Sequence, residues 1–333
     1  MRKVLTLTLS ALFAIAAFAA PTGWKVLKEI KIGGEGGWDY LTMDSAARRL
    51  YVSHATHVVV VDPDAGKVVG DIPDTPGVHG IALAPALNRG FVSNGRGNNV
   101  TIFDMKTLKL ISQVATTGDN PDSIRFEPKS ERVFTFNGRG NNSTAIDAKT
   151  GMVVGTIPMG GKPEFAVADD KGHVYANIED TSEIVEIDAA KAMVTKRYSL
   201  KPCEGPSGLA IDVKKRRLFS VCGNRVMAIS DPDAGKVIAS PAIGAGSDGV
   251  AFDPSTGYAI SSNGDGTLTI VQEMGGKYDV VENVATARGA RTITVDEKTH
   301  NVYLPVADQL PPQPGQRRGG FAPDSFKVLV VGK

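Results

Sequence analysis

The sequence is poor in the features that identify many functional classes. Of 333 residues only two are cysteines, and 37 Lys and Arg are nearly balanced by 36 Asp and Glu. This balance argues against nucleic acid or an anionic membrane as a partner of the whole molecule. The sequence also lacks HExxH and CxxC motifs, a glycine-rich phosphate loop that opens a helix, and a GxSxG nucleophile elbow. The usual signatures of zinc proteases, nucleotide-binding proteins and serine hydrolases are therefore missing.

Long apolar runs are also scarce, and the one at the N-terminus is short. A basic start precedes an apolar stretch over residues 4–17, and Ala17-Phe18-Ala19 supplies small residues where a signal peptidase reads them. The stretch falls short of the roughly 20 residues that a spanning helix needs. We expect a bacterial-type signal peptide over residues 1–19. The remainder, 20–333, is predicted to be a single periplasmic or secreted domain without a membrane span.

What the sequence does contain is an internal repeat. One short apolar segment recurs seven times and ends at Asp44, Ala84, Glu127, Asp169, Asp212, Asp253 and Asp296. Each copy continues with an apolar or aromatic run, a third run that often ends in an acidic residue, a turn, and a fourth run. Four strands in about 42 residues is the period of a propeller blade. The repeat predicts an all-β, seven-bladed β-propeller with four-stranded antiparallel blades.

The seventh copy lacks its fourth strand. Residues 25–32 resemble the fourth run of the other copies and precede the first copy. We expect this N-terminal strand to complete the last blade and close the ring, which removes an exposed sheet edge. Residues 307–325 form an insertion between the second and third strands of that blade. This insertion is either a plain surface loop or a functional one that acts as a lid or docks a partner. The functional interpretation is favoured because long loops in compact domains are often functional.

The strand sequences resemble a known repeat. Tyr51-Val52-Ser53-His54 and Phe91-Val92-Ser93-Asn94, followed by runs that end in Asp and by a Gly-Lys turn, are similar to the YVTN-type propeller repeat. Across all seven copies the chain resembles a periplasmic YncE-like protein of that class. The resemblance implies the propeller fold. For function it implies only a range, since such propellers serve as binding platforms, surface-layer proteins and occasionally enzymes.

Polar residues recur where the inner strand of each copy begins. The loops before the inner strands and those between second and third strands open on one face of a propeller, here called the loop face. At these positions, among Val, Ile, Ala and Leu, stand Asp39, His79, Asp122, Glu164, Ser207, Asp248 and Arg291. They form either a solvated channel mouth or a polar ring that holds a ligand or cation on the axis.

Asn-Gly pairs end several second strands and indicate tight turns with positive φ. The hexapeptide Asn94-Gly95-Arg96-Gly97-Asn98-Asn99 recurs unchanged from Asn137 to Asn142, which places Arg96 and Arg139 on adjacent blades. The two arginines are either solvated turn residues or a pair that grips a carboxylate or phosphate. Asn94, Arg96, Asn137 and Arg139 therefore join the candidate ligand-binding residues.

Histidines and cysteines supply two further candidate sites. His54, His57 and His79 are expected near the acidic ring, where they would bind zinc or copper or provide a general base. Cys203 precedes the inner strand of the fifth copy and Cys222 ends its second strand. In an oxidising compartment a disulfide is expected, and metal ligation by two thiolates is the weaker alternative.

These features leave two functions. The favoured one is a non-enzymatic, exported binding scaffold that holds a small anionic ligand or a protein partner on the loop face around the channel. The alternative is a metal-assisted hydrolase or lyase at the channel mouth, because lactone-hydrolysing propellers hold a divalent cation with channel carboxylates and asparagine. A divalent metal ion is the one cofactor considered, and nucleic acid is not expected as a partner.

Overall fold

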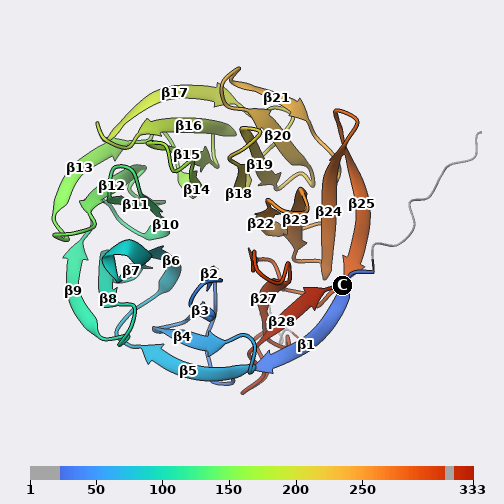
Figure 1. Ribbon diagram of the computed structural model, residues 1–333, viewed down its shortest axis with the longest axis horizontal. Helices are drawn as coiled ribbons and strands as arrows, with labels where there is room; N and C mark the ends of the chain where they lie inside the picture. The colour runs from blue at the N-terminus through green and yellow to red at the C-terminus, as the bar shows by residue number, and fades with distance from the viewer. Residues whose placement is uncertain (1–22, 312–318) are drawn as a thin grey trace, which may run out of the picture.

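The computed structural model describes residues 23–311 and 319–333, so the predicted signal peptide lies outside the described residues. Within these ranges the chain forms 28 strands, β1–β28, and one 3-10 helix, η1 (Pro85–Leu87). The strands make seven four-stranded antiparallel sheets arranged in a ring (Figure 1). No helix in this part of the chain is long and apolar enough to cross a membrane. The predicted seven-bladed β-propeller is confirmed.

Each blade runs from an innermost to an outermost strand (Figure 1). Blade 1 consists of β2 (Leu41–Asp44), β3 (Arg49–His54), β4 (His57–Asp62) and β5 (Lys67–Ile72). Blade 2 consists of β6 (Val78–Ala84), β7 (Arg89–Asn94), β8 (Asn99–Asp104) and β9 (Leu110–Ala115). Blade 3 consists of β10 (Pro121–Glu127), β11 (Arg132–Asn137), β12 (Asn142–Asp147) and β13 (Val153–Pro158). Blade 4 consists of β14 (Pro163–Ala168), β15 (His173–Ile178), β16 (Glu183–Asp188) and β17 (Met193–Ser199). Blade 5 consists of β18 (Pro206–Asp212), β19 (Arg217–Cys222), β20 (Met227–Asp231) and β21 (Lys236–Ala239). Blade 6 consists of β22 (Ser247–Asp253), β23 (Tyr258–Asn263), β24 (Thr267–Met274) and β25 (Lys277–Ala285). Blade 7 consists of β26 (Thr294–Val295), β27 (Val302–Val306), β28 (Lys327–Gly332) and β1 (Lys25–Lys31).

The N-terminal strand closes the ring, as predicted. β1 pairs antiparallel with β28, from Lys25 opposite Gly332 to Lys31 opposite Lys327. In Figure 1 the blue β1 lies on the outer side of the red β28. Ile30 on β1 is buried between blades 7 and 1, and Trp24 just before β1 is buried between blades 6 and 7. The first strand therefore contributes to both interfaces of the last blade.

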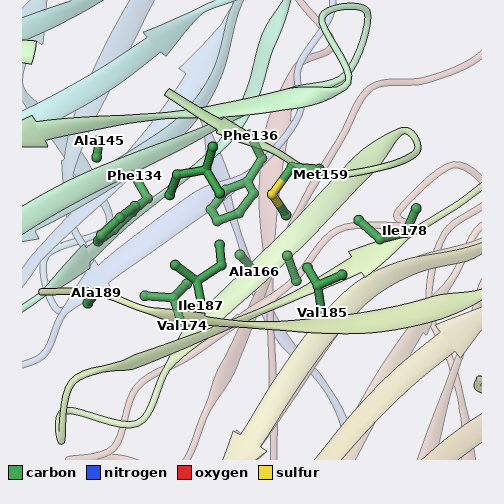
Figure 2. Close-up of a cluster of buried hydrophobic side chains, with 12 residues drawn as sticks. Phe134, Phe136, Ala145, Met159, Ala166, Val174, Ile178, Val185, Ile187 and Ala189 are labelled. Carbon is green, nitrogen blue, oxygen red and sulfur yellow. The ribbon is translucent and has the colours of Figure 1, made fainter. Parts of the chain in front are cut away.

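The core lies between the blades. The described residues form seven clusters of buried apolar side chains, and each cluster joins two neighbouring blades. Figure 2 shows the cluster between blades 3 and 4, where Phe134, Phe136 and Met159 face Val174, Val185 and Ile187. Because each blade packs on both faces, its second and third strands are buried along almost their whole length, which explains their continuous Val, Ile and aromatic runs.

The acidic anchors of the repeat have a structural cause. Asp44 accepts a hydrogen bond from the backbone N–H of Ala47 at 2.9 Å, and Asp253 accepts one from Ser255 at 3.0 Å. Their carboxylates close the turns that follow the inner strands, as Asp side chains commonly do. These anchors lie on the face opposite the loop face and serve the fold.

The predicted disulfide is confirmed. Cys203 and Cys222 are bonded, with their Cα atoms 5.5 Å apart, and both residues are buried. The bond ties the loop before β18 to the end of β19. The structure has no free cysteine in the described residues, so no thiolate is left to bind a metal.

Candidate functional site

The polar ring predicted at the start of the inner strands gathers around the channel mouth on the loop face. His79, Asp122, Glu164 and Asp248 are each the second residue of an inner strand (β6, β10, β14 and β22). Their strands stand innermost in the ring of Figure 1. The side chain of His79 meets carboxylates from two other blades, those of Asp39 and Asp122. Asp39 and Arg291 stand just before β2 and β26 and complete the group.

His79 is the centre of this group. Its Nδ1 donates a hydrogen bond to Asp39 Oδ2 at 2.5 Å and lies 3.4 Å from Asp122 Oδ1. Gly95 on the neighbouring loop explains how the imidazole fits: a Cβ at Gly95 would lie 2.5 Å from His79 Nε2. The glycine therefore leaves room for the ring beside the two carboxylates.

The surroundings keep His79 protonated. Burial lowers the pKa of His79, but its hydrogen bond to Asp39 and the charges of Asp122 and Asp39 outweigh burial and raise it to about 9. At neutral pH the ring thus contains the imidazolium of His79 as well as the guanidinium of Arg291.

The carboxyl groups are shifted toward their neutral forms. Burial, followed by the repulsion of Asp39, raises the pKa of Asp122 to about 7, even though the charge of His79 acts in the opposite direction. Burial and the nearby Asp122 raise the pKa of Glu164 to about 8. Burial and the charge of Asp39 raise the pKa of Asp248 to about 6, while its ion pair with Arg291 Nε at 2.9 Å opposes them. The ring therefore holds protons that the separate residues would release.

An aromatic floor lies directly below the ring. The rings of Tyr40 and Phe165, from opposite sides of the channel, approach to 4.7 Å between centroids. Tyr40 is buried, and burial together with the nearby carboxylates raises the pKa of its hydroxyl well above the usual range. The depression on the loop face and the cavity inside the channel share no lining residue. Tyr40 and Phe165 thus separate the loop face from the rest of the channel.

The predicted arginine pair lies at the rim of this site. Arg96 and Arg139, in the loops after β7 and β11, line a depression of about 860 Å³ together with His79, Arg291 and Trp38. Both arginines are exposed, and the described residues give neither guanidinium a hydrogen-bond or ion-pair partner. The donors of the two guanidiniums are therefore free to bind a ligand.

The explanation of the Asn-Gly pairs by positive φ was wrong. In the two identical hexapeptides the left-handed backbone falls later, at Asn98 (φ 48°) and Asn141 (φ 51°). Asn94 is buried, and its Nδ2 donates to Asn99 Oδ1 at 2.6 Å and to Thr101 Oγ1 at 2.8 Å. The same contacts recur from Asn137 to Asn142 and Thr144 at 2.7 and 3.0 Å. These asparagines hold the loops that present the arginines, and their amides do not line the depression.

The three histidines do not form one cluster. The His54 ring is buried and stacks on the ring of Phe326, with 4.4 Å between the two ring centroids. Neither nitrogen of His54 has a hydrogen-bond partner in the described residues. Burial, with a smaller contribution from His57, lowers the pKa of His54 to about 4, so this ring is neutral. His57 Nε2 instead faces Asp71 Oδ1 at 3.7 Å. The sequence could not show this because Phe326 approaches from the other end of the chain.

One group in the described residues has the arrangement of a metal site. Ligand atoms of Asp39, His79 and Asp122 all lie within 4.8 Å of one another. Two carboxylates and one imidazole suit a divalent transition metal. A metal at this place would have to displace the proton that His79 shares with Asp39.

The insertion between β27 and β28 reaches this site. Its described parts pair with each other, since Leu310 N donates to Gly320 O at 2.8 Å and Ala322 N donates to Asp308 O at 2.8 Å. The ring of Phe321 packs against that of Trp38, with 4.7 Å between the ring centroids. Trp38 and Arg96 both line the depression. The insertion is thus anchored next to the ligand-binding candidates, as its place in the repeat predicted.

Sequence analysis missed the two floor residues. Tyr40 and Phe165 directly follow Asp39 and Glu164, at a position where the other copies carry Gly80, Ser123, Gly208, Gly249 and Thr292. Two large aromatic residues among small ones at one repeat position were the available signal.

Comparison with known proteins identifies the architecture alone. No protein-family model matches the chain, and no curated protein matches its sequence. Among solved structures, a chain of Kuenenia stuttgartiensis hydrazine synthase is similar over 82% of this chain and 94% of that chain, with 17% identity and a TM-score of 0.70. At this identity the likeness shows the fold and says nothing of activity. The protein is a seven-bladed β-propeller.

Proposed function

We propose that this protein is an exported binding scaffold of the YVTN type that holds a small anionic ligand on its loop face. The observation that carries the proposal is a pair of guanidiniums on the rim of one depression, Arg96 and Arg139, to which the described residues give no partner. Arginine presents a planar fork of donors that matches carboxylate and phosphate oxygens. Such a pair of free forks on adjacent blades can bind one anion from two sides.

The charges around the depression support an anion. Its lining includes Arg96, Arg139, Arg291 and the protonated His79, against the carboxylates of Asp39 and Asp119. Asp39 is bound by His79, and Asp119 accepts a hydrogen bond from Asn98 Nδ2 at 3.2 Å. Arg291 is paired with Asp248 and His79 with Asp39, so the positive charge left to meet a ligand is that of Arg96 and Arg139.

Export is part of the proposal. The basic start, apolar stretch and small residues of the first 19 positions have the form of a signal peptide. A buried Cys203–Cys222 disulfide supports a periplasmic or secreted location, since structural disulfides persist in oxidising compartments.

Replacing both rim arginines tests the binding role. In Arg96→Gln/Arg139→Gln we expect stability to change by only a few tenths of a kcal/mol, because neither side chain has a partner among residues 23–311 and 319–333. Ligand binding should weaken by about 1.5–3 kcal/mol for each charge-assisted hydrogen bond removed. Wild-type affinity should also fall with added salt. The measurement is a thermal-shift screen of carboxylates and phosphates on both proteins, followed by calorimetric titration of any hit.

Arg225→Gln is the matched control. Arg225 is an exposed arginine in the corresponding loop of blade 5 and does not line the depression. It should leave binding unchanged. An anion that stabilises wild type and the double variant equally would place the site elsewhere and return Arg96 and Arg139 to the role of solvated turn residues.

The alternative function, a metal-assisted hydrolase or lyase at the channel mouth, is favoured by the Asp39–His79–Asp122 group. A bound metal there would polarise a carbonyl or phosphoryl oxygen or lower the pKa of a bound water. This alternative predicts one divalent ion per chain by elemental analysis. The ion should be lost in His79→Gln and kept in His54→Gln, because His54 is stacked on Phe326 outside the group. Wild-type protein that stays metal-free after incubation with zinc or copper would reject it.

A further inference from the structure

The inner strands carry one cation in a layer that is otherwise apolar or small. Two residues before each anchor the repeat has Thr42, Ala82, Arg125, Val167, Ala210, Ala251 and Thr294. Nothing in the repeat requires a charge at this position. The side chain of Arg125, on β10, enters the channel below the floor of Tyr40 and Phe165, where it lines a cavity of about 300 Å³. The small residues on the other blades leave the space that its guanidinium faces.

Arg125 has few interactions for a charged residue in such a place. Its Nε donates to the carbonyl oxygen of Ala166 at 3.1 Å, and its guanidinium carbon lies 5.7 Å from the centre of the Phe165 ring. Within the described residues no carboxylate forms an ion pair with it, and its two terminal amino groups have no hydrogen-bond partner. Burial lowers the pKa of Arg125, and Asp170 opposes this from a distance longer than an ion pair.

A partly desolvated guanidinium without a counter-ion is unusual. Taking a charge out of water is costly, and such groups are normally paired or fully hydrogen-bonded. The charged residues that line the channel cavity are Arg125 and, toward the opposite mouth, Glu297. The lining therefore carries one cation and one anion, and in the described residues Glu297 forms no ion pair with Arg125.

We propose that Arg125 is the centre of a second binding site, on the face opposite the loop face, for a small carboxylate with an apolar body. The free edge of the guanidinium matches a carboxylate, which can accept two parallel hydrogen bonds. The walls of Val167, Ala210 and Ala251 suit an aliphatic or aromatic body. One cation compensates one negative charge, so a monoanion fits this site better than a phosphate dianion.

The ligand would enter from the mouth opposite the loop face. A depression of about 740 Å³ opens there and shares Arg125 with the channel cavity. Phe126 and Phe252 line it with apolar surface. Its four cations are matched by four carboxylates, so the mouth as a whole does not attract an anion, and the attraction has to come from Arg125, which lacks an ion-pair partner in the described residues. The carboxylates of this mouth would favour ligands that carry no second negative charge. Tyr40 and Phe165 block the way from the loop face, so this site is independent of the one proposed above.

The test uses benzoate and butyrate as probes, with benzamide as the neutral counterpart of benzoate. We expect benzoate or butyrate to raise the melting temperature of the wild-type protein and to bind in calorimetric titration, whereas benzamide should do neither. Arg125→Leu should weaken binding about tenfold or more, the factor expected for losing one charge-assisted hydrogen bond or more. Arg125→Gln keeps a polar side chain in the channel and should lose binding likewise, which covers the case in which the leucine variant does not fold.

Variants on the loop face separate this proposal from the previous one. Arg96→Gln/Arg139→Gln should keep benzoate affinity unchanged, because both residues lie beyond the aromatic floor. The proposal is overturned if neither carboxylate binds the wild-type protein, or if folded Arg125 variants bind as tightly as wild type. It is also overturned if the loop-face variant alone loses binding, a result that would instead support the loop-face site.

Discussion

Deleting residues 24–32 is expected to abolish soluble, folded protein. The deletion removes β1, which forms the outer strand of blade 7, and with it Ile30 and Trp24 from the two interfaces of that blade. Burial of each of these side chains is worth about 1.5–3 kcal/mol, against a total stability of about 5–15 kcal/mol for a typical domain. The loss also exposes the hydrogen-bonding edge of β28, which invites aggregation. Soluble yield and the circular dichroism melting curve of the truncated chain measure the effect.

A circular permutant provides the control. Lys25 lies opposite Gly332, so a short turn can join Lys333 to Trp24 and turn β28 and β1 into an ordinary hairpin. The permuted chain would start at Gly33 and contain every strand. It should fold and melt close to wild type, whereas the deletion should not. A deletion variant that melts normally would show that β1 is dispensable and that another segment closes the ring.

Raising the pH from about 6 to about 9 is expected to destabilise the protein by a few kcal/mol. His79 contributes stability that is fully present below its ordinary pKa of 6.5 and is lost as the pH rises through about 9. The raised pKa values of Asp122, Glu164 and Asp248, about 7, 8 and 6, act with the same sign. The folded ring retains protons that the unfolded chain releases, so each step up in pH favours unfolding. Chemical denaturation at a series of pH values measures the slope.

Glu164→Gln is the sharpest variant for this pH effect. The amide mimics the neutral carboxyl group, so the variant should equal wild type near pH 5, and its advantage should grow as the pH rises and be complete above about pH 8. Glu186→Gln serves as the control, because Glu186 lies on β16 and outside the channel mouth. Equal pH slopes for wild type and Glu164→Gln would mean that Glu164 is ionised in the folded protein and that the ring does not store protons there.

The fold could be predicted from the repeat because the residues that form each blade lie close together in the sequence. Each strand run and each acidic anchor is specified within about 42 residues, so the period, the blade composition and the closing role of residues 25–32 could be derived from the sequence. The pairing of Cys203 with Cys222 was predictable for a related reason, since repeat positions placed both residues on one face of blade 5.

For the site, the repeat predicted which residues lie at one mouth of the channel but not which contacts their side chains make. Repeat positions placed Asp39, His79 and Asp122 at one mouth, where their side chains do meet. They could not show that His54 turns away to stack on Phe326, or that Tyr40 meets Phe165 across the channel. These contacts join blades that are not neighbours in sequence, and they depend on side-chain rotamers. Arg125 lies in the middle of β10, where the repeat pattern does not show whether a side chain faces the channel or a neighbouring blade.

Ring closure by β1 also determines how copies of this protein could exchange strands. The β1–β28 pair joins segments from near the two ends of the described chain, and every other strand pair joins neighbours in sequence. Contacts so distant in sequence form late, because the entropy of closing a long loop is lost before the contact is gained. Until β1 arrives, the edge of β28 can accept the β1 of another copy in the same register. A domain-swapped dimer or chain of propellers is therefore the misassembly that this architecture favours at high concentration.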